Sequence, residues 1–397
     1  MKPTLSSYVW PGQTHFGFGA AAFVGQEAKA LGGTRVFIVA DPGVVAAGLL
    51  GAITPALDAA GLPYTVYDKV VPNPSVESVD AAAAAFRASD ADVIVGMGGG
   101  SGMDTAKAVR ELAGGPAEVS ITAYSYLLQG DNVRAVPTRK QMPPMLAIPT
   151  TAGTGAEATP WAVITDTSAH RKFGIGGPAL LPDVALCDPE LTLTLPPFLT
   201  AATGMDALTH LIEAYVSTNN HQPALDPLIL YGIELIGKSL RTAVLQGSNP
   251  QARADVMKSA MLGGIAISSN WLGACHALAH PLSGIANVHH GLANAIMLPY
   301  QMEYTLPGAL ERYAKVAAAL APEEALGASI RQQAQRAVDA VRALLVDVGL
   351  PTRLRDARVK EEMIQPLAEQ AIQDLNHATN PRPVTQATLE QLYRQAY

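Results

Sequence analysis

Cysteine and charge are both scarce in this sequence. The 397 residues include two cysteines, Cys187 and Cys275, too few for the disulfide framework of a small secreted domain. Charged residues make up 15 %, the net charge is −7, and lysine and arginine form no run. This composition excludes the basic surface by which proteins bind nucleic acid. With 49 % hydrophobic residues, the chain is also too apolar to be intrinsically disordered.

Long apolar runs are missing as well. The best candidate, residues 44–57, contains Pro55 and is well short of the ~20 apolar residues that a transmembrane helix needs. Pro11 and Gly12 stand where a signal peptide would have its apolar core. We therefore expect a cytoplasmic enzyme that acts on a small molecule, with no membrane or nucleic-acid partner. The low charged fraction also fits a subunit contact, so we expect a homodimer or a higher homo-oligomer.

The two halves of the chain differ in their patterns. Short β-branched runs alternate with alanine-rich helical stretches in the first half, and this alternation predicts βαβ units and a mostly parallel sheet. The expected strands cover residues 36–39, 64–71, 92–96, 145–148 and 184–187. From Pro196 onward the apolar residues follow a long helical period. The sequence thus predicts a dinucleotide-binding α/β domain at 1–190 and an all-helical, metal-binding domain at 191–397.

A glycine-rich segment follows the expected strand 92–96. Residues 93–107 read VIVGMGGGSGMDTAK, a strand that runs through glycines into a helix, where backbone N–H groups can bind a pyrophosphate. Gly98, Gly99 and Gly100 allow close approach of the ligand, and Ser101 adds a hydroxyl donor. A tight turn without a ligand is the alternative. The segment is neither a P-loop nor G-x-G-x-x-G, and the GFGAAA stretch at 17–22 precedes the first strand, so we interpret it as a turn.

Asp41 follows the expected strand 36–39 closely. A carboxylate in this place can bind the ribose hydroxyls of adenosine and repel a 2′-phosphate, which favours NAD over NADP. The alternative is a helix N-cap, because Pro42 follows.

Histidines concentrate in the second half, where six of the nine lie between residues 210 and 290. Asp206 and His210 are four residues apart, as are His276 and His280, so each pair projects from one helix face. His290 follows shortly afterwards. Imidazole and carboxylate ligands suit Fe(II), Zn(II) or Mn(II). The H-x-x-x-H pair lacks the glutamate of a metalloprotease, because alanine follows its first histidine. Separate histidines packed in a core are the alternative.

A dinucleotide and a metal together point to hydride transfer. We expect the two sites to meet in a cleft between the domains, where a Lewis-acid metal stabilises the alkoxide of an alcohol and polarises the aldehyde in the reverse direction. The sequence therefore predicts a metal-dependent oxidoreductase that uses NAD and acts on a small primary alcohol or aldehyde, including a diol or a functionalised aldehyde.

Four motifs occur in a fixed order along the chain: GGGSxxD from residue 98, IPTTAGTGAE from 148, AATGMDALTH from 201, and HALAHPL from 276 with HGLAN from 290. Together they resemble the iron-dependent (group III) alcohol dehydrogenase family over nearly the whole chain. The resemblance implies a Rossmann-like N-terminal domain and an all-helical C-terminal domain, an architecture shared with dehydroquinate synthase.

The resemblance also implies roles for individual residues. Asp206, His210, His276 and His290 match the metal ligands, with Fe(II) typical and Zn(II) sometimes found, and His280 matches a catalytic histidine near the nicotinamide. The cofactor-binding positions match Asp41, Asn73, Gly98, Gly99, Gly100, Ser101, Thr150, Thr151, Thr154 and Lys172.

Other functions are compatible with parts of this pattern. One is a metal- and NAD-dependent lyase on the same scaffold, and another is a reductase similar to maleylacetate reductase or glycerol dehydrogenase. A third is a metal-binding protein without catalysis. Trp161 and Trp271 either narrow the substrate pocket or pack in the core, and the Asn376-His377 pair stands where relatives often have cysteine.

Overall fold

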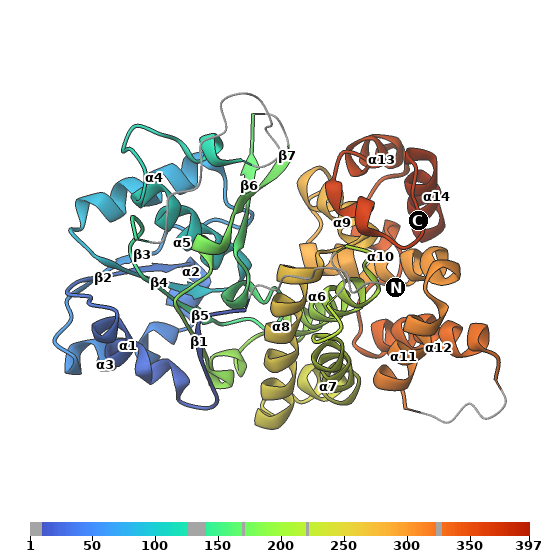
Figure 1. The fold of residues 1–397 in the computed structure, drawn as a ribbon, viewed down its shortest axis with the longest axis horizontal. Coiled ribbons are helices and arrows are strands. Elements are labelled where there is room, and N and C mark those ends of the chain that lie inside the picture. Colours follow the sequence, from blue (N-terminus) through green and yellow to red (C-terminus); the bar gives the residue numbers. More distant parts are fainter. Residues whose placement is uncertain (1–9, 126–139, 169–170, 220–221, 323–327) are drawn as a thin grey trace, which may run out of the picture. The chain divides into compact units, whose positions relative to one another are not determined.

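The computed structural model describes residues 10–125, 140–168, 171–219, 222–322 and 328–397. The described chain forms two compact units (Figure 1). The sheet unit contains Trp10–Thr151 and Gly155–Thr194, and the helical unit contains Ala152–Thr154 and Leu195–Tyr397. Among the described residues, none of the helices combines the length and the apolar character that crossing a bilayer requires.

The sheet unit is built on a six-stranded sheet in which every pairing is parallel. Its order is β1-β8-β5-β4-β2-β3. The strands are β1 (Gln13–Phe16), β2 (Val36–Ala40), β3 (Tyr64–Tyr67), β4 (Val93–Gly98), β5 (Met145–Pro149) and β8 (Val184–Cys187). The expected parallel α/β fold is confirmed. Strands β2, β4 and β5 are buried along their whole length, which explains their unbroken apolar sequences.

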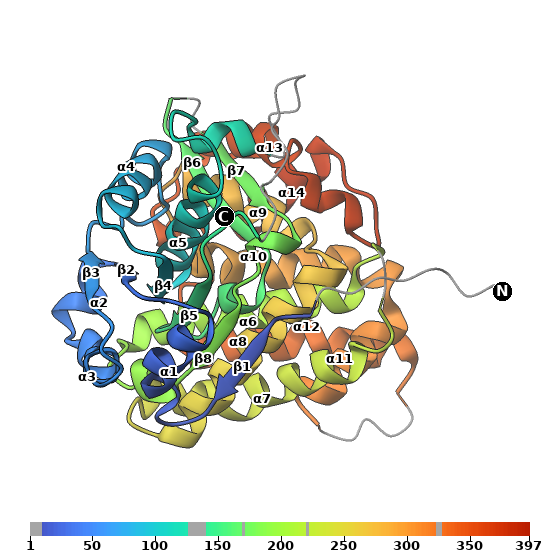
Figure 2. The same ribbon diagram turned by 60° about the vertical axis from the view of Figure 1, so that its left-hand side comes forward.

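Two apolar layers cover the sheet, because successive side chains of a strand point to opposite faces. Phe37 and Val39 of β2 pack toward α4 (Val76–Ala88) and α5 (Gly100–Ala113). Val36 and Ile38 pack toward α1 (Val24–Ala30) and α3 (Thr54–Ala59). Figures 1 and 2 show α4 on one side of the strands and α1 and α3 on the other. The short α2 (Pro42–Ala46) follows β2 directly.

The sheet unit differs from the sequence-based expectation at three strands. β3 ends at Tyr67 instead of Val71, since the polar pair Asp68-Lys69 follows it. β1 lies at the sheet edge beside β8 and carries Gln, Thr and His, so it lacks an apolar signal. The antiparallel hairpin of β6 (Trp161–Asp166) and β7 (Arg171–Gly176) was not expected. At 17–22, Gly19 adopts a left-handed φ of 82°, which confirms the expected turn.

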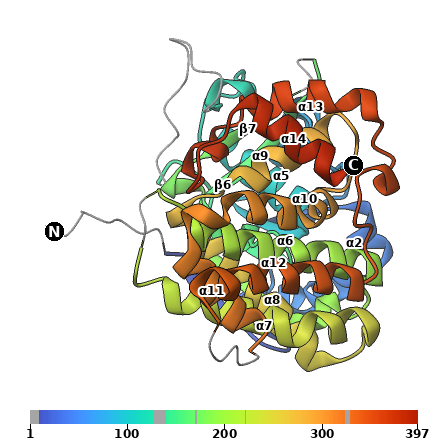
Figure 3. The same ribbon diagram turned by 90° about the vertical axis from the view of Figure 1, so that its right-hand side faces the viewer.

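The helical unit is organised around α6 (Pro197–Val216), in which every residue from Thr200 onward is buried. α7 (Asp226–Leu245), α8 (Pro250–Asn270) and α10 (His290–Thr305) pack against α6 (Figure 3). The remaining helices are α9 (Ala274–Gly284), α11 (Leu310–Leu320), α12 (Ile330–Asp347), α13 (Ile364–Ala371) and α14 (Gln386–Ala396). The expected all-helical C-terminal region is confirmed.

Candidate metal centre and cofactor loop

Three of the expected metal ligands converge in the helical unit. Asp206 on α6, His276 on α9 and His290 at the start of α10 each offer a ligand atom, and these atoms lie within 4.8 Å of one another. Asp206 Oδ1 is 4.0 Å from His276 Nε2 and 3.7 Å from His290 Nε2. Two ligands that each bind one metal at about 2.1 Å are separated by at most about 4.2 Å. The two separations from Asp206 Oδ1 therefore fit one shared ion.

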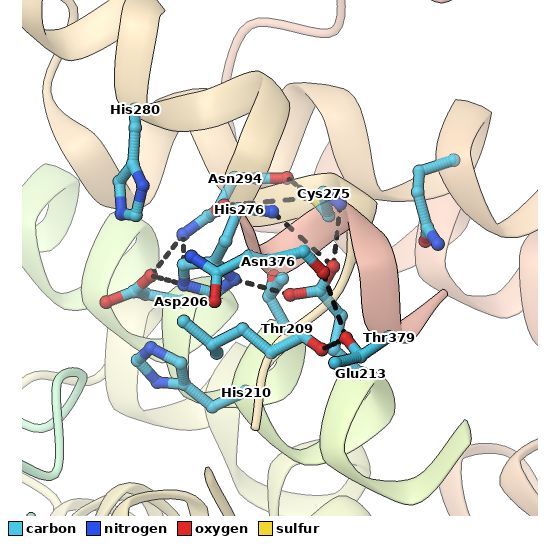
Figure 4. A network of polar contacts seen from close by, with 12 residues as sticks. Asp206, Thr209, His210, Glu213, Cys275, His276, His280, Asn294, Asn376 and Thr379 are labelled. Atoms are coloured by element: carbon cyan, nitrogen blue, oxygen red, sulfur yellow. Dashed lines mark hydrogen bonds and ion pairs between the residues drawn. The ribbon is translucent and has the colours of Figure 1, made fainter. Parts of the chain in front are cut away.

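The side-chain amide of Asn294 shows where these ligand atoms point. Asn294 Nδ2 donates to Asp206 Oδ1 at 2.6 Å and lies 3.1 Å from His276 Nε2 (Figure 4). It also lies 3.2 Å from His290 Nε2. An amide NH₂ carries partial positive charge and only donates. Since one such group reaches all three atoms, their lone pairs face a common point, and the donor set suits a divalent cation.

His210, the fourth expected ligand, lies beside this group but is not part of it. Its ring stacks on that of His276 with centroids 4.8 Å apart. Its Nδ1 is 3.3 Å from the carbonyl oxygen of Gly153. Because a carbonyl only accepts, this contact assigns the proton to Nδ1 and leaves the lone pair of the ring on Nε2. A Cβ on Gly153 would lie 2.6 Å from Thr203 Cβ, so glycine allows this carbonyl to approach α6.

Two glycines let neighbouring helices approach α6 at the ligand positions. A Cβ on Gly291 would lie 2.3 Å from the carbonyl oxygen of Ala202, so the start of α10 reaches α6 only with glycine there. A Cβ on Gly263 of α8 would lie 3.2 Å from His210 Cβ. The close packing of α10 on α6 brings His290 to Asp206.

His280 lies next to the three converging ligands. Its ring centroid is 5.8 Å from that of His276 and 5.4 Å from that of His290. Its Nδ1 is 2.6 Å from Asp374 Oδ2. Burial alone would raise the pKa of Asp374, but the charge of His280 and its hydrogen bond outweigh burial and hold this pKa below its ordinary value. Asp374 was not expected, because it lies 94 residues from His280 in the sequence.

Glu213 was not expected at this site either. It lies on α6, and its Oε2 is 2.5 Å from His276 Nδ1. Burial lowers the pKa of His276 well below its ordinary value, so the imidazole is neutral, as a metal ligand must be. Burial also raises the pKa of Glu213 to about 7, although backbone N–H groups oppose this shift. Its position three residues after His210, on the same helix face, was an available signal.

The glycine loop of the sheet unit has the expected strand-to-helix geometry. β4 ends at Gly98, whose φ of +156° is rarely accessible to other residues, and α5 starts after Gly99. A Cβ on Gly98 would lie 3.1 Å from Asp41 Oδ2, and one on Gly99 would lie 3.1 Å from Thr151 Cγ2. The N–H of Thr150 donates to the carbonyl of Gly98 at 2.9 Å. Asp41, Thr150 and Thr151 therefore surround the loop.

Asp41 is also a helix N-cap. Its Oδ1 accepts a hydrogen bond from the N–H of Val44 at 3.0 Å and caps α2. Its Oδ2 faces Gly98. The capping interpretation of the sequence is correct, and it leaves one carboxylate oxygen directed at the glycine loop.

Three further expected cofactor residues are joined in a chain of hydrogen bonds. The N–H of Asn73 donates to Ser101 Oγ at 3.2 Å, and Lys172 Nζ donates to Asn73 Oδ1 at 2.8 Å. Asn73 has a left-handed φ of 51°, a conformation that asparagine tolerates better than most residues. The Pro-Asn-Pro turn, the start of α5 and strand β7 thus meet at Asn73. Thr154, the last expected cofactor residue, belongs to the helical unit.

A cluster of charged residues joins Asp104 and Lys107 of α5 to Glu157, which lies outside that helix. Lys107 Nζ donates to the carbonyls of Thr159 and Trp161 and to Thr159 Oγ1 at 2.7–2.9 Å. Burial lowers the pKa of Lys107 to about 8 and raises those of Asp104 to about 6 and of Glu157 to about 7. Three protein acceptors engage this ammonium group, so Lys107 anchors the segment before β6 and does not serve as a phosphate ligand.

Comparisons with known proteins cover nearly the whole chain. The family model "Iron-containing alcohol dehydrogenase" matches residues 11–189, and "Fe-containing alcohol dehydrogenase family, C-terminal" matches residues 200–397. Lactaldehyde reductase of Escherichia coli strain K12 is 38 % identical over 96 % of this chain and 97 % of its own.

Solved structures agree with the sequence comparisons. The crystal structure of 1,3-propanediol oxidoreductase has a TM-score of 0.93 and 36 % identity, covering 99 % of this chain and 100 % of its own. Sulfoacetaldehyde reductase of Bifidobacterium kashiwanohense in complex with NAD⁺ has a TM-score of 0.86 and 31 % identity, covering 99 % of both chains.

Proposed function

This chain belongs to the iron-containing alcohol dehydrogenase family, and from that premise we propose that it transfers a hydride between NAD(H) and a small primary alcohol or aldehyde. The proposal depends above all on one observation. Asp206 Oδ1, His276 Nε2 and His290 Nε2 face a common point, which Asn294 Nδ2 marks.

We assign the metal to Asp206, His210, His276 and His290. The family favours Fe(II), and Zn(II) suits the same imidazole and carboxylate ligands. When bound, the ion supplies a Lewis acid for the substrate oxygen. Three neutral imidazoles and one carboxylate cancel only one of its two positive charges, so this donor set preserves its ability to polarise a carbonyl. Burial keeps His276 neutral, so this ligand does not change the net charge at the ion.

We assign the cofactor to the glycine loop. Gly98, Gly99, Gly100 and the N-terminus of α5 offer backbone N–H groups to the pyrophosphate, and Ser101 adds its hydroxyl. Asp41 Oδ2 is in place to accept from ribose hydroxyls and to repel a 2′-phosphate. Asn73, Lys172, Thr150, Thr151 and Thr154 complete the proposed cofactor residues. The NAD⁺ complex of the related sulfoacetaldehyde reductase supports NAD as the cofactor.

We assign His280 as the catalytic residue that relays a proton or positions the nicotinamide. Asp374 accepts from its Nδ1, which keeps Nε2 as the nitrogen that can exchange a proton during the reaction. Its ring lies beside those of His276 and His290, so this nitrogen belongs to the same site.

Reconstitution tests the function directly. Protein treated with a chelator and reloaded anaerobically with Fe(II) should oxidise NADH over many turnovers with lactaldehyde, sulfoacetaldehyde or the aldehyde of 1,3-propanediol, compounds chosen from the names of the relatives. His276→Ala should bind the metal much more weakly and lose activity with it. Full activity of the metal-free protein would overturn the proposal. A bound NAD that never exchanges with the medium would favour the lyase instead.

We also propose that the chain works as two domains, 1–190 and 191–397, in a cytoplasmic homodimer or higher homo-oligomer. Limited proteolysis and light scattering of the purified protein test the domain boundary and the oligomeric state.

A further inference from the structure

A buried carboxylate stands behind the candidate ligand His276. Glu213 is 1 % exposed and lies on the same face of α6 as Asp206 and His210. Its Oε2 is 2.5 Å from His276 Nδ1, and its Oε1 accepts from the N–H of Cys275 at 2.6 Å and from that of His276 at 3.4 Å (Figure 4). One side chain of α6 thus holds both the backbone and the ring of a residue on α9.

The start of α9 is built around this carboxylate. Its N-cap is Gly273, which has no side chain with which to cap the helix. A Cβ at Gly273 would lie 2.7 Å from Glu213 Oε1. The N–H groups of Cys275 and His276, which have no partner within a helix of their own, are satisfied by Glu213 instead. The glycine therefore makes room for a cap that another helix supplies.

We propose that Glu213 is the positioning residue of the metal centre, setting the tautomer and orientation of His276. This inference depends on the proposed metal site. The ionised form of Glu213, which a bound cation favours, only accepts, so the ring proton then lies on Nδ1 and the lone pair on Nε2, the atom that faces Asp206 Oδ1 and His290 Nε2. A carboxylate behind a metal-bound histidine fixes the ring and raises the basicity of its ligating nitrogen.

Glutamine cannot replace this glutamate, although it has the same shape. It offers one acceptor and one donor. If the glutamine carbonyl faces the N–H groups of Cys275 and His276, its NH₂ group faces Nδ1 and drives the proton to Nε2, where the metal needs a lone pair. If the amide is reversed, its NH₂ group faces two N–H donors and α9 loses its cap.

Metal affinity tests the proposal without relying on activity. Glu213→Gln should weaken Co(II) and Zn(II) binding about 10–100-fold, measured by competition with a chromophoric chelator, and should alter the visible spectrum of the Co(II) protein. Thr209→Val removes a buried hydroxyl that bonds within the same helix, so this control should leave the affinity unchanged. Gly273→Ala, which displaces the carboxylate without deleting it, should also weaken binding.

A double-mutant cycle separates positioning from general damage to the fold. If Glu213 acts through His276, the loss caused by Glu213→Gln should vanish in the His276→Ala background. Wild-type affinity in both Glu213→Gln and Gly273→Ala would overturn the proposal while leaving the metal site intact, as would additive losses in the cycle. Absence of metal binding by the wild-type protein would overturn the proposed function itself.

Discussion

Glu111 on α5 makes the stability of this protein sensitive to pH in a direction that can be calculated. The side chain is 0 % exposed, and within the described part of the chain neither of its carboxyl oxygens has a hydrogen-bond partner. Burial raises its pKa from 4.5 to about 8. The folded protein thus keeps this carboxyl protonated at neutral pH, whereas the unfolded chain ionises it.

The sign and size of the effect follow from proton linkage. The stabilisation is complete below the unfolded pKa and is lost as the pH rises toward the folded pKa, at about 1.4 kcal/mol per pH unit. Over the interval from 4.5 to about 8, the free energy of unfolding falls by about 4–5 kcal/mol. Glu111→Gln keeps the neutral amide at every pH. The variant should therefore be more stable than the wild type by about 4 kcal/mol at about pH 8.5 and by about 1 kcal/mol at about pH 5.5.

Thermal unfolding of the chelator-treated protein measures this difference. For a unit of this size about 4 kcal/mol corresponds to a Tm higher by about 8–16 °C. Glu118→Gln, a substitution at an exposed glutamate shortly after α5, is the matched control and should follow the wild type at each pH. Parallel Tm profiles of wild type and Glu111→Gln across the whole pH range would refute the reasoning.

Substitutions at two further positions, Asp41 and Gly291, test the site. Asp41→Asn keeps a good N-cap for α2 but removes the charge, so kcat/KM for NADPH relative to NADH should rise about tenfold at unchanged Tm. Asp41→Ala should lose the cap as well, about 1 kcal/mol, and an unchanged cofactor ratio in both variants would contradict the role of Asp41. Gly291→Ala, whose Cβ would meet a backbone oxygen at 2.3 Å, should displace His290 and lower metal content about tenfold, whereas Gly284→Ala in open space should bind metal normally. Equal metal content in the two glycine variants would show that close packing at Gly291 is not needed.

Features that depend on neighbouring residues were predictable. The spacing of Asp206 and His210 placed both on one face of α6, and that of His276 and His280 placed both on α9. The glycines after β4 marked the turn into α5. The edge strand β1 and the β6–β7 hairpin were missed. β1 is polar, and the N–H groups of Val163 and Thr165 in the hairpin bond to Asp104 and Pro74, which lie far away in the sequence.

The composition of the site could be predicted only in part. Family motifs named His210 as a ligand, but the structure groups Asp206, His276 and His290 and places His210 beside them, against the Gly153 carbonyl. Nothing local distinguishes the two histidines of α9 from each other. His276 and His280 are distinguished by their carboxylate partners, which are Glu213 and Asp374.

The sequence by itself determined the buried strands, the helical C-terminal region, the glycine loop and the residue types that can bind a metal, since these depend on residues close together in the chain. Only the tertiary structure decided which side chains meet. Glu213 reaches His276 across 63 residues and Asp374 reaches His280 across 94. Such partners leave no periodic signal, because they are selected by helix packing, and that packing depends on single missing Cβ atoms at Gly273 and Gly291.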